Sequence, residues 1–332
     1  MSNVADGACQ AQVPEDETVR TGGTLRSHAV GALLAVSSVV AIAVAISAVG
    51  SPSRVFAVLK TGNWAWVAVA LVASLATNVA YAVALKGTVK VALPLVATTE
   101  LEVAMTYSNV VVPLIGGTAL QIRFLEKQGV PLPSAVTAGS VLSAAGAAIS
   151  ELPLFFLALV LSSNGIALGT LPVRRVLEVS AVVVVLLALA VVAAVELQHV
   201  QGKLMRPIKE GLTTIADALS SWRQLALLLL GKAGASLLYG ACLLACIQAF
   251  DADVSYWTAL AVSIGVSSVA AAIPLPGGNT GAGTVGVAGV LVALGVHSQT
   301  ALAVSIANQL AVNYIPAVPG WFATRDLLHK LV

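Results

Sequence analysis

Long runs of apolar residues, separated by short polar stretches, make up most of this chain. Each run is close in length to the roughly 20 residues that an α-helix needs to cross a bilayer. The pattern predicts an all-α, polytopic membrane protein with about eight transmembrane helices. The expected spans are residues 30–49, 64–85, 134–161, 176–197, 224–250, 256–273, 280–295 and 300–322.

One further apolar stretch, residues 91–118, is interrupted by prolines and polar residues. Basic residues concentrate in cytoplasmic loops, so their distribution indicates how this stretch meets the membrane. If it dips in and returns to the same side, twelve Lys and Arg residues lie inside and four outside. If it crosses fully, the basic loop at 203–223 faces outward. We therefore predict a re-entrant segment, with both termini in the cytoplasm.

The composition supports a membrane protein, because 58% of the residues are hydrophobic and only 10% are charged. Typical soluble domains carry about 25% charged residues. Residues 1–27 are polar and are expected to form a disordered cytoplasmic tail ahead of a transmembrane domain at 28–330. A secretory signal would begin with basic residues and have a shorter apolar core, so residues 30–49 are interpreted as an anchor helix. We expect a multi-pass protein of the bacterial inner membrane.

Two Pro-Gly stretches resemble each other: "VVPLIGG" at 111–117 and "AIPLPGG" at 272–278. Each is followed by a Gly-Val turn and a new apolar run, and on the predicted topology the two copies have opposite orientations. Inverted repeats with paired, Pro/Gly-interrupted segments are typical of transporters whose binding site lies near the bilayer midplane. Non-helical backbone at that depth needs protein or a water-filled cavity beside it. A chance likeness between two Pro-Gly loops is the alternative.

Four ionisable residues fall within apolar segments, where a charge costs free energy and commonly serves a function. They are Glu100, Glu102, Glu151 and Lys232. Charge matching to a ligand and proton coupling are the functional interpretations. A buried pair of Glu151 and Lys232 with a purely structural role is the alternative, since pairing neutralises buried charge.

The chain carries none of the common catalytic arrangements. "GAGTVG" at 281–286 has the letters of a dinucleotide-binding loop, but no acidic residue follows about 20 positions later. No Ser-His-Asp set, paired carboxylates or metal-binding spacing of His and Cys is present, and no basic face with interleaved aromatic residues suggests nucleic acid. We expect a protein that is not an enzyme, has no cofactor or metal, and does not bind nucleic acid.

Four stretches form an ordered set of motifs: "NVVVPLIGGTALQIRFLEKQGV" (109–130), "IPLPGG" (273–278), "LVALGVHSQTALAVSIANQL" (291–310) and "YIPAVPGWFATRDLL" (314–328). Together they resemble the lysylphosphatidylglycerol synthase transmembrane-region family, also called flippase-like membrane proteins, over about residues 28–330. The resemblance implies translocation or handling of a lipid. Three residues depart from the family pattern: Thr118 stands where Glu is frequent, Thr284 stands at or beside a second Glu position, and Gln309 stands at an Arg position.

These motifs and the polar residues beside them supply the candidate ligand-binding set. Because the charged family positions are replaced, we expect neutral amide and hydroxyl groups to solvate a head group. The set is Asn109, Pro113, Gly116, Gly117, Arg123, Pro276, Gly277, Gly278, Asn279, Thr280, Thr284, Asn308 and Gln309.

The expected function is translocation or handling of a lipid or a lipid-linked head group across the cytoplasmic membrane. Membrane lipids are the expected partners, with a lipid-linked sugar or an envelope enzyme as further candidates. The alternative is a non-transporting accessory or scaffold subunit of an envelope lipid or glycan pathway. Some relatives carry a soluble aminoacyl-transfer domain; this chain ends soon after the last expected span, so aminoacyl-lipid synthesis is not expected.

Overall fold

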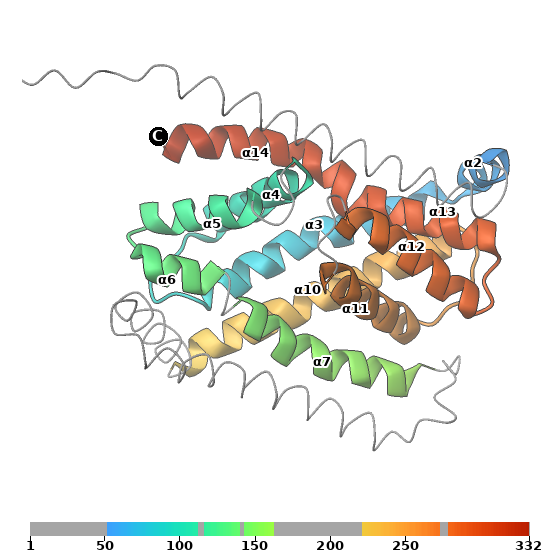
Figure 1. Cartoon of the computed structure of the whole chain (residues 1–332), viewed down its shortest axis with the longest axis horizontal. Coiled ribbons are helices and arrows are strands. Elements are labelled where there is room, and N and C mark those ends of the chain that lie inside the picture. Colours follow the sequence, from blue (N-terminus) through green and yellow to red (C-terminus); the bar gives the residue numbers. More distant parts are fainter. Residues whose placement is uncertain (1–51, 112–115, 140–142, 163–220, 273–277, 332) are drawn as a thin grey trace, which may run out of the picture.

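The computed structural model describes residues 52–111, 116–139, 143–162, 221–272 and 278–331. Within those ranges the chain is helical and contains no β-strand, as the sequence predicted (Figure 1). The helices are α2 (Pro52–Thr61), α3 (Trp64–Lys86), α4 (Leu95–Val111), α5 (Gly116–Lys127), α6 (Leu132–Thr137), α7 (Ser143–Leu161), α10 (Trp222–Ala249), α11 (Tyr256–Ala272), α12 (Gly278–Ala293), α13 (Ser298–Gln309), the π-helix η4 (Leu310–Tyr314) and α14 (Ile315–Leu331).

Three stretches of the described chain are long and apolar enough to cross a membrane: Trp64–Lys86, Trp222–Ala249 and Ser298–Leu327. They correspond to the predicted spans 64–85, 224–250 and 300–322. The predicted spans 134–161, 256–273 and 280–295 contain shorter apolar helices instead, at Ala145–Leu161, Tyr256–Ala270 and Gly283–Ala293. The predicted tail at 1–27 and the spans 30–49 and 176–197 lie outside the described residues.

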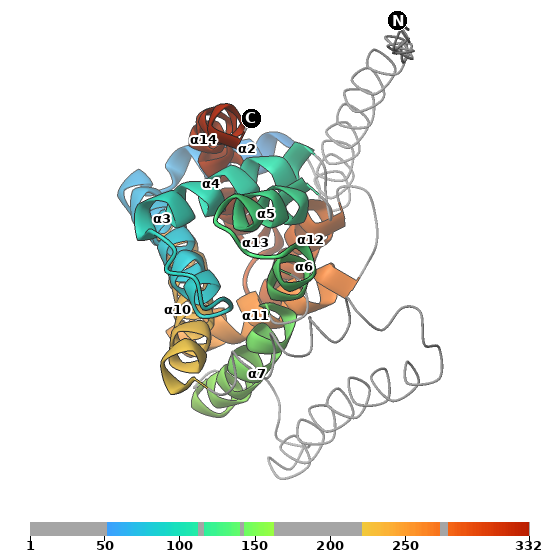
Figure 2. The same ribbon diagram turned by 90° about the vertical axis from the view of Figure 1, so that its left-hand side faces the viewer.

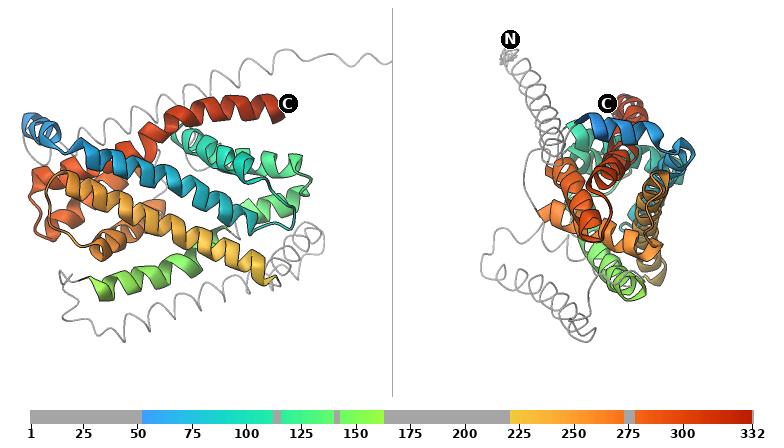
Figure 3. Two further views of the ribbon diagram at one scale, coloured as in Figure 1. Left: turned by 180° about the vertical axis from the view of Figure 1, so that it is seen from behind. Right: turned by 90° about the vertical axis from the view of Figure 1, so that its right-hand side faces the viewer.

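Helices α3 and α10 pack side by side along the centre of the fold (Figure 3). They run antiparallel, because the Asn63 N–H donates to the Ala249 carbonyl at one end (2.8 Å) and the Gln224 amide donates to the Val89 carbonyl at the other (3.0 Å). Gly231 lies against the α3 backbone at Ala84, where any side chain would collide. Small residues that let backbones approach are typical of helix contacts in membranes.

Helices α4 and α5 form a hairpin, here called the first hairpin, beside one end of the α3–α10 pair. Leu93, just before α4, belongs to the same buried apolar cluster as Phe124 and Leu125 near the end of α5. The chain therefore returns to the end from which it entered. Because α5 has only 12 residues, it is too short to cross a bilayer. This path agrees with the re-entrant segment predicted from the basic residues.

Helices α11 and α12 form a second hairpin of the same kind at the other end of the pair (Figure 1). In the view along the pair, both hairpins lie on the same side of α3 and α10 (Figure 2). Val254, just before α11, shares a buried cluster with Val287 and Leu291 of α12 and with Ile247 of α10. The sequence predicted two full spans here. The structure has an apolar helix in each stretch, and the described residues give α11 a length of 17 and α12 a length of 16, somewhat below the roughly 20 typical of a full crossing.

The two hairpins are related as an internal repeat. Helix α11 begins 161 residues after α4 begins (256 − 95). The turns that follow the hairpins also match, since Gly129 and Gly295 have φ of 84° and 91°. In each turn the glycine N–H donates to the carbonyl three residues back (2.9 Å), and the following valine donates to the carbonyl five back (3.0 Å).

The repeats are inverted. The first hairpin lies beside Leu85, at the C-terminal end of α3, whereas the second lies beside Ile247, at the C-terminal end of the antiparallel α10. In keeping with this symmetry, α4 packs against α14 and α11 packs against α7. The matching turns and the opposite positions of the two hairpins support an inverted repeat over a chance likeness of two loops.

Candidate functional site

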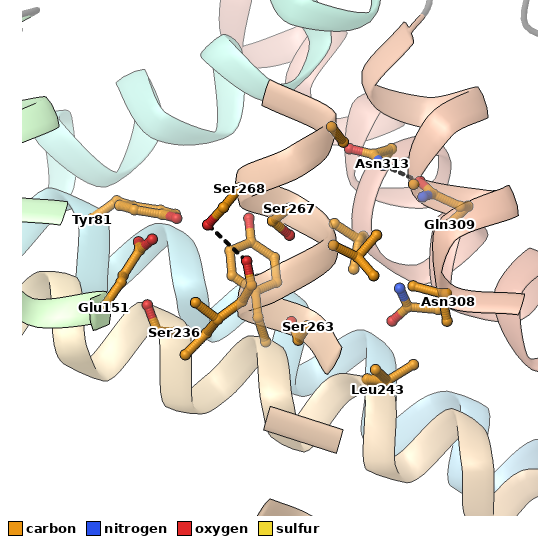
Figure 4. A pocket seen from close by; sticks show the side chains of 17 residues that line it. Tyr81, Glu151, Ser236, Leu243, Ser263, Ser267, Ser268, Asn308, Gln309 and Asn313 are labelled. Carbon is orange, nitrogen blue, oxygen red and sulfur yellow. Dashed lines mark hydrogen bonds between the residues drawn. The ribbon is translucent and has the colours of Figure 1, made fainter. Parts of the chain in front are cut away.

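A cavity of about 350 Å³ lies among α3, α7, α10, α11, α12, α13 and η4, and we call it the polar cavity. Figure 4 shows Tyr81, Glu151 and Ser236 on one side, the amide side chains on the other, and the serines of α11 between them. Its polar lining residues are Tyr81, Glu151, Ser236, Tyr239, Ser263, Ser267, Ser268, Asn308, Gln309 and Asn313.

The polar cavity lies at the middle of α10, one of the three membrane-compatible helices among the described residues. Ser236 is 14 residues after Trp222 and 13 before Ala249, the first and last residues of α10 (236 − 222 and 249 − 236). At 1.5 Å per residue this is about 20 Å from each end. Polar side chains at that depth need partners or water, because hydrocarbon satisfies none of their hydrogen bonds.

Helix α11 supplies a hydroxyl wall. Ser263 and Ser267 are four residues apart, so they lie on one face of the helix, and both line the polar cavity. Ser268 also lines it, and its hydroxyl donates to the Ile264 carbonyl of the preceding turn (2.8 Å). Since Ser267 and Ser268 are exposed, the polar cavity reaches the protein surface along this wall.

Helix α13 and the π-helix supply an amide wall. The Asn313 amide donates to the Gln309 side-chain carbonyl (2.5 Å), and the Cys242 thiol of α10 donates to the Asn308 side-chain carbonyl (3.7 Å). A Cβ at Gly283 would lie 2.6 Å from the Gln309 Nε2 atom. A glycine at that position of α12 therefore leaves room for the glutamine amide at the polar cavity.

Charged groups gather at the side of the polar cavity formed by α7 and α10. Glu151 lies beside Ser236, and Lys232 lies close enough to Glu151 and Glu102 to interact with both carboxylates. The Lys232 ammonium also lies 4.9 Å from the centre of the Tyr81 ring, a cation–π distance. Glu102, Glu151 and Lys232 come from α4, α7 and α10, so this cluster joins the two halves of the fold.

The structure therefore brings together part of the predicted set. Glu151, Asn308 and Gln309 line the polar cavity, and Glu102 and Lys232 belong to the charged cluster beside it. Thr284 is buried in α12, and its carbonyl accepts a bond from the Ser305 hydroxyl (2.5 Å).

Among the predicted residues whose side chains the structure describes, Asn109, Arg123 and Glu100 do not line the polar cavity. Asn109 is exposed, and its side-chain carbonyl accepts a bond from the Gly117 N–H (3.0 Å). Arg123 is exposed on α5, and Glu100 is half-buried on α4. Asn109 thus stabilises the first hairpin, and Gly116 and Gly117 begin α5. Gly278, Asn279 and Thr280 begin α12, whereas Pro113, Pro276 and Gly277 lie outside the described residues.

Sequence reasoning did not identify several lining residues, among them Tyr81, Ser236 and Tyr239. Two signals were present in the sequence. Ser263 and Ser267 share a helix face, and Asn313 follows Gln309 by four residues. The aromatic and serine residues of α3 and α10 gave no such signal, because single Tyr and Ser residues are common in membrane helices.

Comparison with known proteins adds one finding. The family model described as "Lysylphosphatidylglycerol synthase TM region" matches residues 30–320. The match covers all the helices that build the polar cavity. No curated protein matches the chain.

Proposed function

The chain belongs to the lysylphosphatidylglycerol synthase TM region family, and from this membership and the polar cavity we propose that it translocates lipids. In this account the polar cavity receives the head group of a lipid or lipid-linked molecule, and the acyl chains stay in the bilayer. The protein acts as a transporter in the cytoplasmic membrane, with both termini in the cytoplasm, and not as an enzyme.

One observation carries the proposal: a cavity rich in hydroxyl and amide groups at the middle of membrane-compatible helices. A head group that leaves water loses hydrogen bonds, and each unsatisfied polar group costs several kcal/mol in hydrocarbon. Ser263, Ser267 and Gln309 offer replacement partners within one space. Glu151 adds a carboxylate that can match a positive group or attract a cation.

The inverted hairpins suggest how access alternates between the two sides of the membrane. In transporters built from inverted repeats, one repeat rocks against the other around a fixed site near the midplane. Here the second hairpin supplies a wall of the polar cavity, and the first hairpin contributes Glu102 to the adjoining charged cluster. Movement of α11 and α12 relative to α4 and α5 would then expose the head group first on one side and afterwards on the other.

The test is lipid translocation by the purified protein in vesicles of phosphatidylglycerol and phosphatidylethanolamine. A trace of fluorescent phosphatidylglycerol is bleached from outside by dithionite, which cannot cross the bilayer. With active protein, bleaching is expected to proceed beyond the outer leaflet. The Gln309→Leu variant, which removes one amide from the polar cavity, is expected to slow it.

Bleaching confined to the outer leaflet, as in protein-free vesicles, would contradict translocation of this lipid. A non-transporting accessory subunit would then be the better account. A second preparation carries a fluorescent lipid-linked sugar in place of the phosphatidylglycerol probe. Bleaching of this probe beyond the outer leaflet would mean that the protein transports a different lipid, and bleaching confined to the outer leaflet would mean that it transports neither.

A further inference from the structure

A second cavity, which we call the apolar cavity, lies next to the polar one. It has a volume of about 430 Å³ and lies between α7, α11 and α12. Phe155 and Leu159 line it from α7, and Gly286 and Val290 line it from α12. Each of the ten described residues that line it is aliphatic, aromatic or glycine, so this lining offers dispersion contacts and no side-chain hydrogen bond.

Helix α11 separates the two cavities and presents a different face to each. Ser263 and Ser267 face the polar cavity. Ala261, Gly265 and Val269, also spaced by four residues, face the apolar cavity. Val266 and Ala270 line both cavities. The polar and apolar spaces therefore meet along one edge of this helix.

Glycines help to keep the apolar cavity open. A Cβ at Gly265 would lie 3.2 Å from the Phe155 ring, and a Cβ at Gly286 would lie 2.8 Å from a Val266 methyl. Larger residues at either position would force the lining to shift. At its outer side the cavity includes Val269, whose side chain is 64% exposed, so a ligand can reach it from the surface.

We infer that the apolar cavity binds one acyl chain of the same molecule whose head group occupies the polar cavity. This inference rests on the proposed function. A ligand that fills both spaces must be polar at one end and apolar at the other, with the two parts joined near Val266 and Ala270. An aromatic ring fits a cavity of about 150 Å³, so the larger apolar cavity suits an extended hydrocarbon chain.

The test uses the full-length protein in vesicles of phosphatidylglycerol and phosphatidylethanolamine. A trace of phosphatidylglycerol carries a photoreactive diazirine along one acyl chain, and labelled residues are mapped by mass spectrometry after irradiation. We expect strong labelling of Phe155 and Val269. Leu230 of α10, which is 70% exposed and lies outside the cavity, reports the contact of bulk lipid and should be labelled less.

Two test variants and one control variant distinguish a bound acyl chain from bulk lipid. Val269→Trp places a large side chain at the mouth of the apolar cavity and should reduce the labelling of Phe155 several-fold, with Leu230 unchanged. Val72→Trp, at another exposed valine (66%), is the matched control and should have no effect. Gln309→Leu, which alters only the polar cavity, should also reduce the labelling of Phe155, because one molecule occupies both spaces.

Equal labelling of Phe155 and Leu230, or labelling of Phe155 that is insensitive to Gln309→Leu, would overturn the inference. Because Val269 is exposed, its replacement disturbs little packing, and elution as a single peak in detergent confirms that the variant folds. Labelling reports binding and not movement. Coupled labelling without translocation would therefore contradict only the proposed function, whereas translocation with uncoupled labelling would contradict only the acyl-chain site.

Discussion

At the scale of single residues, the polar cavity depends on close fits between small and polar side chains. Gly283 leaves room for the Gln309 amide, and Asn313 holds that amide through a hydrogen bond. Lys232 interacts electrostatically with two carboxylates and lies over an aromatic ring. A change of a few atoms at either place should therefore alter function or stability without changing the fold.

Gly283→Ala is expected to push the Gln309 amide out of its present position. The new methyl group would lie 2.6 Å from Nε2, closer than van der Waals contact allows, so the glutamine must shift. We expect lipid translocation to fall several-fold. Gly289→Ala is the matched control on the same helix, because nothing lies within 4 Å of its Cβ position. Equal translocation rates for the two variants would show that Gln309 does not bind the head group.

Lys232→Met should destabilise the protein, because it leaves Glu102 and Glu151 without their shared cation. Removing one partner of a buried ion pair costs about 3–5 kcal/mol, and the half-buried position of Lys232 suggests the lower end. The measurement is the midpoint of thermal unfolding in detergent. Lys60→Met, at an exposed lysine, should leave the midpoint unchanged.

A second change provides an internal check on the charged cluster. Glu102→Gln added to Lys232→Met should recover part of the lost stability, because fewer uncompensated charges remain. Strictly additive effects of the two substitutions would mean that these side chains do not interact.

At the scale of elements, the sequence predicted the long helices well and the hairpins less well. The bounds of α3 and α10 follow from long apolar runs that end near Lys86 and Asp251. Residues 256–273 and 280–295 are just as apolar, so hydropathy alone could not reveal that their helices are short. The re-entrant segment at 91–118 was predicted because prolines and polar residues interrupt its apolar run and the basic residues indicate its sidedness.

Only some of the residues that line the polar cavity could likewise be predicted from the sequence. Asn308 and Gln309 could be selected because they are amides within an apolar run. Tyr81 and Ser236 could not, because their positions depend on how α3 and α10 pack. Asn109 was selected for its place in a motif, and the structure shows that it bonds to the Gly117 backbone.

The turns after the two hairpins should respond equally to mutation. Gly129 and Gly295 both have positive φ, and nothing lies within 4 Å of either Cβ position. An alanine at either position should therefore cost only the backbone strain, about 1–2 kcal/mol. Thermal unfolding of Gly129→Ala and Gly295→Ala measures this cost. A clear difference between the two would mean that the turns are not equivalent parts of a repeat.

At the scale of the whole molecule, the inverted repeat predicts a second arrangement of the same parts. Ser263 and Ser267 of α11 correspond to Glu102 and Thr106 of α4 (263 − 161 and 267 − 161). In the present structure Thr106 is half-buried, and its hydroxyl donates to Asn78 of α3 (3.5 Å). Ser267 is exposed and lines the polar cavity. At this pair of matching positions, the α11 side chain is therefore exposed at the polar cavity and the α4 side chain is packed more deeply.

Cysteine accessibility should reveal this asymmetry. In a background where the native cysteines are replaced by alanine, Ser267→Cys should react quickly with a water-soluble maleimide, and Thr106→Cys slowly. Joining Ser267→Cys to Asn313→Cys with a short bifunctional thiol reagent closes the polar cavity and should increase the reactivity of Thr106→Cys. Unchanged reactivity of Thr106→Cys after this closure would contradict alternation between the repeats.

The central claim is that lipid head groups pass through the polar cavity, and one measurement tests it most directly. Ser267→Phe fills the polar cavity from an exposed position, so packing elsewhere is preserved, and Val72→Phe adds the same ring to an exposed site outside it. The rate of the bleaching that follows loss of the outer-leaflet signal in reconstituted vesicles should fall to that of protein-free vesicles for Ser267→Phe and stay at the wild-type rate for Val72→Phe. A wild-type rate for a folded Ser267→Phe protein would contradict the claim.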